Sequence, residues 1–304
     1  MDGFGVHAIH ERGKGIAPLP LVIMHGWPGS FSQMLKLIPL LVDPAAHGGD
    51  ASDAFDIVVP SLPGFGFSDR PQRRGWTTER TADLWARMMT GELGYERFGA
   101  HGGDWGSAVT ESLARRHPEL LTGIHLTDVP SGHIFRVADP TDEEQKYVAA
   151  GMAWADKEGA YGSIQSTKPQ TLAYGLNDSP VGLAAWIAEK FRSWSDCDGD
   201  IERSFTRDEL LTNVMIYWTT QTINSSIRGY FESGHQGSAD DSRMEVPSGF
   251  AIFPADLVPP PRRFAERIFN VQRWTEMPAG GHFAAMEEPE LLAGDIRAFY
   301  RQFQ

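Results

Sequence analysis

The chain has 304 residues, 41% of them hydrophobic, and carries 27 Lys and Arg against 40 Asp and Glu. These values are typical of a soluble globular enzyme and exclude a largely disordered chain. The net charge of −13 argues against nucleic acid or an anionic membrane surface as a partner, because both attract clustered cations. The single Cys197 excludes an intrachain disulfide. With no signal-peptide pattern and no apolar run of about 18 residues, we expect a cytoplasmic protein.

From about Leu19 to Asp128, short apolar runs alternate with helical segments, as in a parallel α/β sheet. The candidate strands are Leu19–Met24, Phe55–Pro60 and residues 97–101, 122–127, 249–253 and 268–274. Residues 133–237 instead read as helices rich in Trp and Tyr, and Thr206 with Glu209 predicts a capping box at the start of one of them. The last helix is expected over residues 287–303. The sequence therefore predicts a core of residues 1–132 and 238–304 with an inserted helical lid, residues 133–237.

The sequence Gly-Gly-Asp-Trp-Gly, from Gly102 to Gly106, follows one predicted strand and precedes a helix predicted over residues 107–117. Strand, tight turn and helix form the nucleophile elbow of the α/β-hydrolase fold, which usually carries serine where this chain has Asp104. A carboxyl group with a reference pKa of about 3.9 is ionised at neutral pH and can attack saturated carbon without a base. The expected reaction is therefore displacement at an sp³ carbon, with an epoxide alkoxide or a halide as leaving group.

The other members of a catalytic triad follow in the chain order of this fold. Asp256 comes after the strand predicted over residues 249–253, and His282 lies in Gly-Gly-His-Phe after the next strand. His282 is expected to take a proton from water, and Asp256 to orient its imidazole. A turn histidine with no chemical role is the alternative reading, and Asp256 alone is a weak signal.

The loop His-Gly-Trp-Pro-Gly, which starts at His25, directly follows the strand Leu19–Met24. This is where the fold places the first donor of an oxyanion hole, so the backbone N–H groups of Trp27 and Trp105 are the expected donors. His25 and Pro28, together with Trp105 and Phe283, are expected to bind substrate.

Two tyrosines of the predicted lid, Tyr161 and Tyr230, are candidates for donating a proton to an alkoxide, because a phenol stays protonated at pH 7. A halide needs only N–H dipoles, so these tyrosines favour an epoxide. Their spacing does not show that they converge, and a buried tyrosine is more often a packing residue.

Six segments of the chain together resemble the microsomal-type epoxide hydrolases, including the juvenile hormone epoxide hydrolases. The segments are residues 25–30, 102–107, 164–171, 177–185, 210–220 and 280–285. The resemblance implies the α/β-hydrolase fold, Asp104 as nucleophile, Tyr161 and Tyr230 as paired donors to the epoxide oxygen, and His282 with its acid as the water-activating pair.

The chain departs from that family in two places. The mammalian microsomal enzymes carry glutamate where this chain has Asp256, so we expect the triad to persist with altered geometry. Members also carry a long N-terminal wrapping segment, whereas the hydrolase domain here starts almost at Met1. We expect that segment to be absent and leave the first strand open.

The sequence thus predicts an epoxide hydrolase that converts an apolar or aromatic epoxide to a vicinal diol through an ester on Asp104. Its partners are expected to be the epoxide and water, with no cofactor, metal, nucleic acid or membrane, and a homodimer is left open. A haloalkane or haloacetate dehalogenase with the same nucleophile is the first alternative. A non-catalytic binding protein of hydrolase fold is the second.

Overall fold

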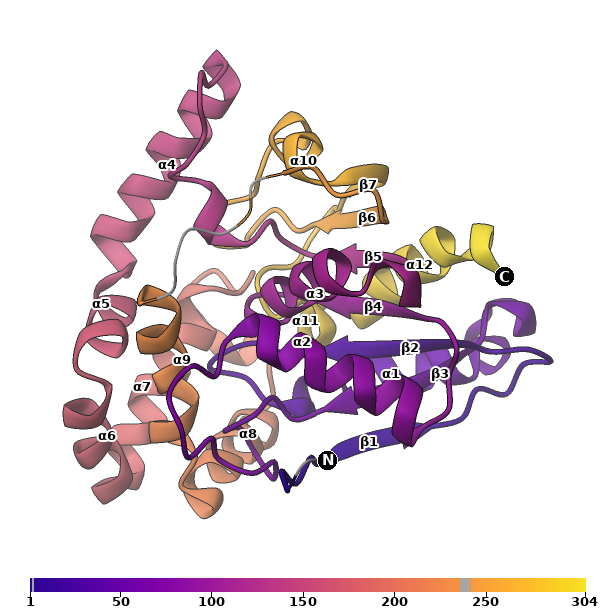
Figure 1. The fold of residues 1–304 in the computed structure, drawn as a ribbon. Coiled ribbons are helices and arrows are strands. Elements are labelled where there is room, and N and C mark those ends of the chain that lie inside the picture. The colour runs from indigo at the N-terminus through magenta and orange to yellow at the C-terminus, as the bar shows by residue number, and fades with distance from the viewer. Residues whose placement is uncertain (2, 236–239, 241) are drawn as a thin grey trace.

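The computed structural model describes residue 1, residues 3–235, residue 240 and residues 242–304. Within these residues one seven-stranded sheet has the order β1-β3-β2-β4-β5-β6-β7, with β1 antiparallel to β3 and all other neighbours parallel (Figure 1). The strands are β1 (Ala8–Glu11), β2 (Leu19–Met24), β3 (Phe55–Pro60), β4 (Phe98–Gly102), β5 (Leu121–Leu126), β6 (Pro247–Ile252) and β7 (Asn270–Glu276). The mostly parallel sheet confirms the predicted fold class.

Helices lie on both faces of the sheet and at one of its ends. They are α1 (Leu37–Val42), α2 (Thr78–Arg87), α3 (Trp105–Arg116), α4 (Asp142–Glu158), α5 (Ala160–Thr167), α6 (Pro169–Asp178), α7 (Pro180–Ser193), α8 (Arg207–Thr220), α9 (Ile223–Gly234), α10 (Arg262–Ile268), α11 (Ala284–Glu287) and α12 (Pro289–Tyr300). None of these helices is long and apolar enough to cross a bilayer.

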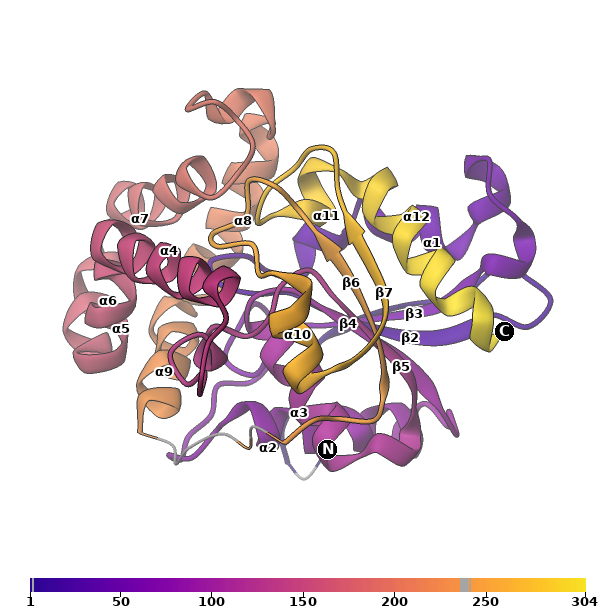
Figure 2. The same ribbon diagram turned by 90° about the horizontal axis from the view of Figure 1, so that it is seen from above.

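Alternating side chains of the central strands build two separate cores. In β2, Leu21 and Ile23 pack with α1 and α12, whereas Val22 and Met24 pack on the opposite face with α2 and α3. Successive side chains of a strand point to opposite faces, so a strand that is apolar throughout is covered on both sides. Figure 2 shows the sheet between these two helical layers.

Each of the predicted strands is present with its ends shifted by at most two residues. The helix predicted over residues 107–117 begins earlier, at Trp105, and the last helix, α12, begins two residues later than predicted and ends at Tyr300, where a 3-10 turn follows. The first strand, which the sequence left open, is also present. It is β1, which pairs with β3 through Ala8 and Pro60 at the edge of the sheet.

Helices α4 to α9 lie between β5 and β6 in the chain and gather at one end of the sheet (Figure 1). The predicted capping box is confirmed at α8, where Glu209 N–H donates to the Thr206 hydroxyl and the Glu209 carboxylate accepts from the Thr206 N–H. We propose that this helical segment acts as a lid. Its predicted end at residue 237 lies outside the described residues.

Helix α3 approaches β2 closely through Gly106. A Cβ at this position would lie 2.4 Å from the carbonyl oxygen of Met24, whereas a Cβ on Gly294 of α12 would meet nothing within 4 Å. Both glycines are helical, so both gain helix propensity when replaced by alanine.

We therefore expect opposite effects of the two replacements in urea unfolding. Gly294→Ala should raise the free energy of unfolding by about 0.5–1 kcal/mol. Gly106→Ala should lower it by about 1–3 kcal/mol, because overpacking displaces backbone. Equal effects at the two positions would contradict the close approach of α3 to β2.

Candidate active site

Asp104 lies at the turn between β4 and α3 with φ 55° and ψ −123°. A non-glycine residue at positive φ is strained and is typical of the nucleophile elbow. The backbone of Gly26 lies close to the Asp104 side chain. A Cβ added to Gly26 would lie 2.4 Å from both Cβ and Oδ1 of Asp104. The elbow therefore holds the carboxylate against the loop that follows β2.

His282 lies between two carboxylates. Its Nδ1 donates to Oδ1 of Asp256 at 2.7 Å, and its Nε2 is 3.6 Å from Oδ2 of Asp104. Burial disfavours the imidazolium, but the negative charges of Asp256 and Asp104 and the hydrogen bonds to them outweigh it, so the pKa of His282 is well above 6.5. The imidazole of His282 is therefore charged at neutral pH.

The backbone N–H groups of Trp27 and Trp105, the expected oxyanion-hole donors, differ in their partners. The Trp27 N–H donates to Oδ1 of Asp104 at 2.8 Å. Trp105 is the first residue of α3, so its N–H has no partner within the helix. The Trp105 side chain instead packs edge-on against Tyr230, with ring centroids 5.1 Å apart.

The structure brings Tyr161 of α5 and Tyr230 of α9 together above the elbow loop. Their ring centroids are 5.9 Å apart, and the Trp27 ring stacks on Tyr161 at 5.4 Å and lies edge-on to Tyr230 at 5.7 Å. Burial raises the pKa of both phenols above the usual value of 10, and the negative charge of Asp104 adds to the increase. Both side chains therefore remain protonated at neutral pH and can donate a proton.

The other residues expected to bind substrate, His25, Pro28 and Phe283, contact the loops and helices around the site. His25 is paired through both ring nitrogens, Nε2 accepting from the Leu62 N–H at 3.1 Å and Nδ1 lying 3.0 Å from the Gly26 carbonyl oxygen. Burial lowers the pKa of His25 to about 4, so the ring is neutral and has no free nitrogen for a substrate. Pro28 accepts a hydrogen bond from α8, and Phe283 stacks on α7.

Asp128 is a further carboxyl group at the site that sequence reasoning missed. Its Oδ1 accepts from the Asp104 N–H at 3.1 Å and from the Ser107 hydroxyl. Burial and the negative charge of Asp256 raise the pKa of Asp128 to about 7. Its position directly after β5, at the same edge of the sheet as the elbow, was the available signal.

A cavity of about 30 Å³ lies against Asp104 and His282 and is also lined by Gln33, His101 and Thr127. This is enough room for one water molecule with several polar neighbours. Among the described residues, no group of three or more His, Cys, Asp or Glu side chains is placed to hold a metal ion.

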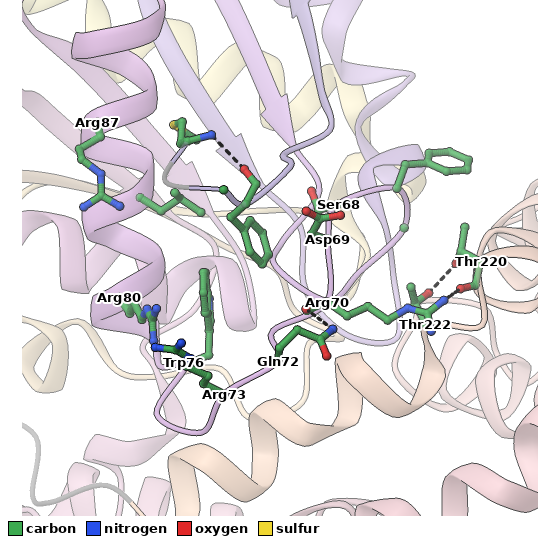
Figure 3. Close-up of a pocket in the computed structure, with 16 residues that line it drawn as sticks. Ser68, Asp69, Arg70, Gln72, Arg73, Trp76, Arg80, Arg87, Thr220 and Thr222 are labelled. Atoms are coloured by element: carbon green, nitrogen blue, oxygen red, sulfur yellow. Dashed lines mark hydrogen bonds between the residues drawn. The ribbon is translucent and has the colours of Figure 1, made fainter.

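A much larger open cleft of about 930 Å³ lies elsewhere, beside the N-terminus, and none of the triad residues lines it (Figure 3). Its wall carries Arg70, Arg73 and Arg80, and the Arg80 guanidinium lies 4.3 Å from the centroid of the Trp76 ring. The size of this cleft therefore does not locate the predicted catalytic residues Asp104 and His282, which line the much smaller cavity.

The sequence matches the alpha/beta hydrolase fold over residues 20–161 and the family described as "Epoxide hydrolase N terminus" over residues 1–34. A relative from Stigmatella aurantiaca is 44% identical, with 100% of this chain and 69% of the relative covered. Epoxide hydrolase 1 of Oryctolagus cuniculus is 38% identical, with 98% and 72% covered. The chain belongs to the microsomal-type epoxide hydrolase family.

Solved structures of related enzymes agree with this placement. The crystal structure of juvenile hormone epoxide hydrolase from Bombyx mori has a TM-score of 0.82 at 30% identity and covers 99% of this chain and 74% of its own. The Aspergillus niger epoxide hydrolase has a TM-score of 0.83 at 28% identity, with 100% and 77% covered. The family is that of hydrolases acting on ether bonds, which decides against a dehalogenase at the level of the family.

The charge of Asp256 is the largest of the effects that raise the pKa of His282. We expect Asp256→Asn to lower this pKa, because an amide can still accept a hydrogen bond but no longer stabilises the imidazolium by charge. NMR titration of the His282 ring protons measures the change. Asp83→Asn, which removes a carboxylate paired with Arg116, is the control. An unchanged pKa in Asp256→Asn would contradict the described pairing.

Proposed function

We propose that the protein hydrolyses an apolar or aromatic epoxide to a vicinal diol in two covalent steps at Asp104. The position of the Asp104 carboxylate supports this most directly. One of its oxygens accepts from the Trp27 N–H, and the other lies 3.6 Å from Nε2 of His282. The ring of Trp27, whose N–H binds this carboxylate, contacts the rings of both Tyr161 and Tyr230.

In the first step, Oδ2 of Asp104 attacks a carbon of the epoxide ring, and the bond from that carbon to the epoxide oxygen breaks. Tyr161 or Tyr230 gives its proton to the departing oxygen, which becomes the first hydroxyl of the diol. The carboxylate becomes a neutral ester. The loss of this charge removes one of the two negative charges that raise the pKa of His282. His282 therefore gives its proton to the phenolate left on the tyrosine, which restores the tyrosine and leaves His282 neutral.

In the second step, neutral His282 takes a proton from water, and the hydroxide attacks Cγ of Asp104. The Trp27 N–H stabilises the negative charge that develops on Oδ1, as an oxyanion-hole donor does. The ester bond from Cγ to oxygen breaks, and the second diol oxygen takes the remaining proton of the water. Asp104 is again a carboxylate and His282 is again charged, so protons and charges balance over the cycle.

The tyrosine pair provides the test of this function. Wild type should convert styrene oxide to its diol. Tyr161→Phe combined with Tyr230→Phe should lower kcat/KM by about 10²–10⁴-fold, the usual contribution of a general acid. Each single variant should lose less, because the other phenol remains.

Tyr174→Phe is the matched control, since Tyr174 is an exposed tyrosine of the same helical segment. Circular dichroism checks that all variants fold. Undiminished turnover in the double variant would refute the donor role. Absence of diol with styrene oxide and with longer aliphatic epoxides would refute the proposed function.

A further inference from the structure

The carboxylate of Glu287, at the end of α11, is surrounded by backbone N–H groups. Its Oε2 accepts from Gly281 at 3.1 Å and from Asp196 at 2.7 Å, and its Oε1 accepts from Phe283 at 2.9 Å. Gly281 and Phe283 are the two neighbours of His282 in the chain. Glu287 therefore holds the histidine loop from both sides of the catalytic residue.

The third donor, Asp196, belongs to the segment that follows α7, and further bonds join this segment to the same loop. The His282 N–H donates to the Trp194 carbonyl oxygen at 2.9 Å, and the Gly280 N–H donates to Oδ2 of Asp196 at 3.0 Å. The Trp194 ring also lies 5.3 Å from the His282 ring and 5.1 Å from that of Tyr161, centroid to centroid. The histidine loop is thus joined to the segment after α7, whose Trp194 ring packs against Tyr161 of α5.

This arrangement requires an acceptor at both side-chain oxygens of residue 287. Only a carboxylate offers this, because an amide replaces one oxygen with an N–H₂ donor that would face a backbone N–H. Hydrogen bonds from N–H groups to an ionised oxygen are also shorter and stronger than neutral ones. Glutamine at position 287 would therefore lose at least one of the three bonds.

We propose that Glu287 is a positioning residue that holds His282 at the distance from Asp104 at which it activates water. The inference rests on the proposed two-step function. Because Glu287 acts through His282 and does not contact the Asp104 carboxylate, it affects the second step. Attack on the epoxide depends on Asp104 and the tyrosines and proceeds without it.

The test separates the two steps by rapid quench and intact-protein mass spectrometry with styrene oxide. Burial raises the pKa of Glu287 to about 7. The assay is therefore run at pH 8, where the Glu287 carboxylate is largely ionised. In Glu287→Gln we expect ester formation at the wild-type rate and ester hydrolysis slowed by about tenfold or more, because small displacements of a catalytic group are costly. Ester-modified protein should accumulate. Glu290→Gln, an exposed carboxylate on α12, is the control and should behave as wild type.

A second variant, Asp196→Ala, keeps the proposal testable if Glu287→Gln does not fold. Asp196 is exposed, and its replacement removes the bond from the Gly280 N–H to its side chain but keeps the backbone N–H that donates to Glu287. We expect the same accumulation of ester to a smaller extent. Equal slowing of both steps, or unchanged hydrolysis, in a folded variant would overturn the positioning role. Failure of the wild type to form any ester would instead contradict the proposed function.

Discussion

The negative charge of the Asp104 carboxylate is the constraint on which the rest of the site depends. The strained elbow presents this charge to the Trp27 N–H at 2.8 Å and to the imidazole of His282 at 3.6 Å. While the charge is present, it helps to keep His282 protonated. Once the carboxylate is esterified, as we propose, that support is lost and His282 becomes a base. One group would then control both steps of the reaction.

The helices between β5 and β6 supply what the sheet does not. They bring the rings of Tyr161 and Tyr230 together, with centroids 5.9 Å apart, and the Tyr161 ring stacks on that of Trp27. The same burial that excludes water raises the pKa of the phenols and keeps them protonated. The proposed role of Glu287 adds that the histidine is fixed to this helical segment. Proton donors and water activation then share one rigid frame.

The sequence predicted those features that depend on local pattern. Strand, glycine-rich turn and helix identified the elbow at Asp104, and Thr206 with Glu209 identified the start of α8, because each signal lies within a few residues. Convergence of the lid tyrosines could not be predicted, since it depends on how α5 and α9 pack. Glu287 was missed for a similar reason, because one of its three donors, the Asp196 N–H, lies 91 residues away in the chain.

Single-turnover hydrolysis of styrene oxide in ¹⁸O-labelled water, with enzyme in excess, tests most directly whether Asp104 forms the covalent ester. We expect the first diol released to contain unlabelled oxygen from Asp104, and the label to appear in the carboxylate of that residue by peptide mass spectrometry. Label in the first diol, with none in Asp104, would show that water attacks the epoxide itself and would contradict the account.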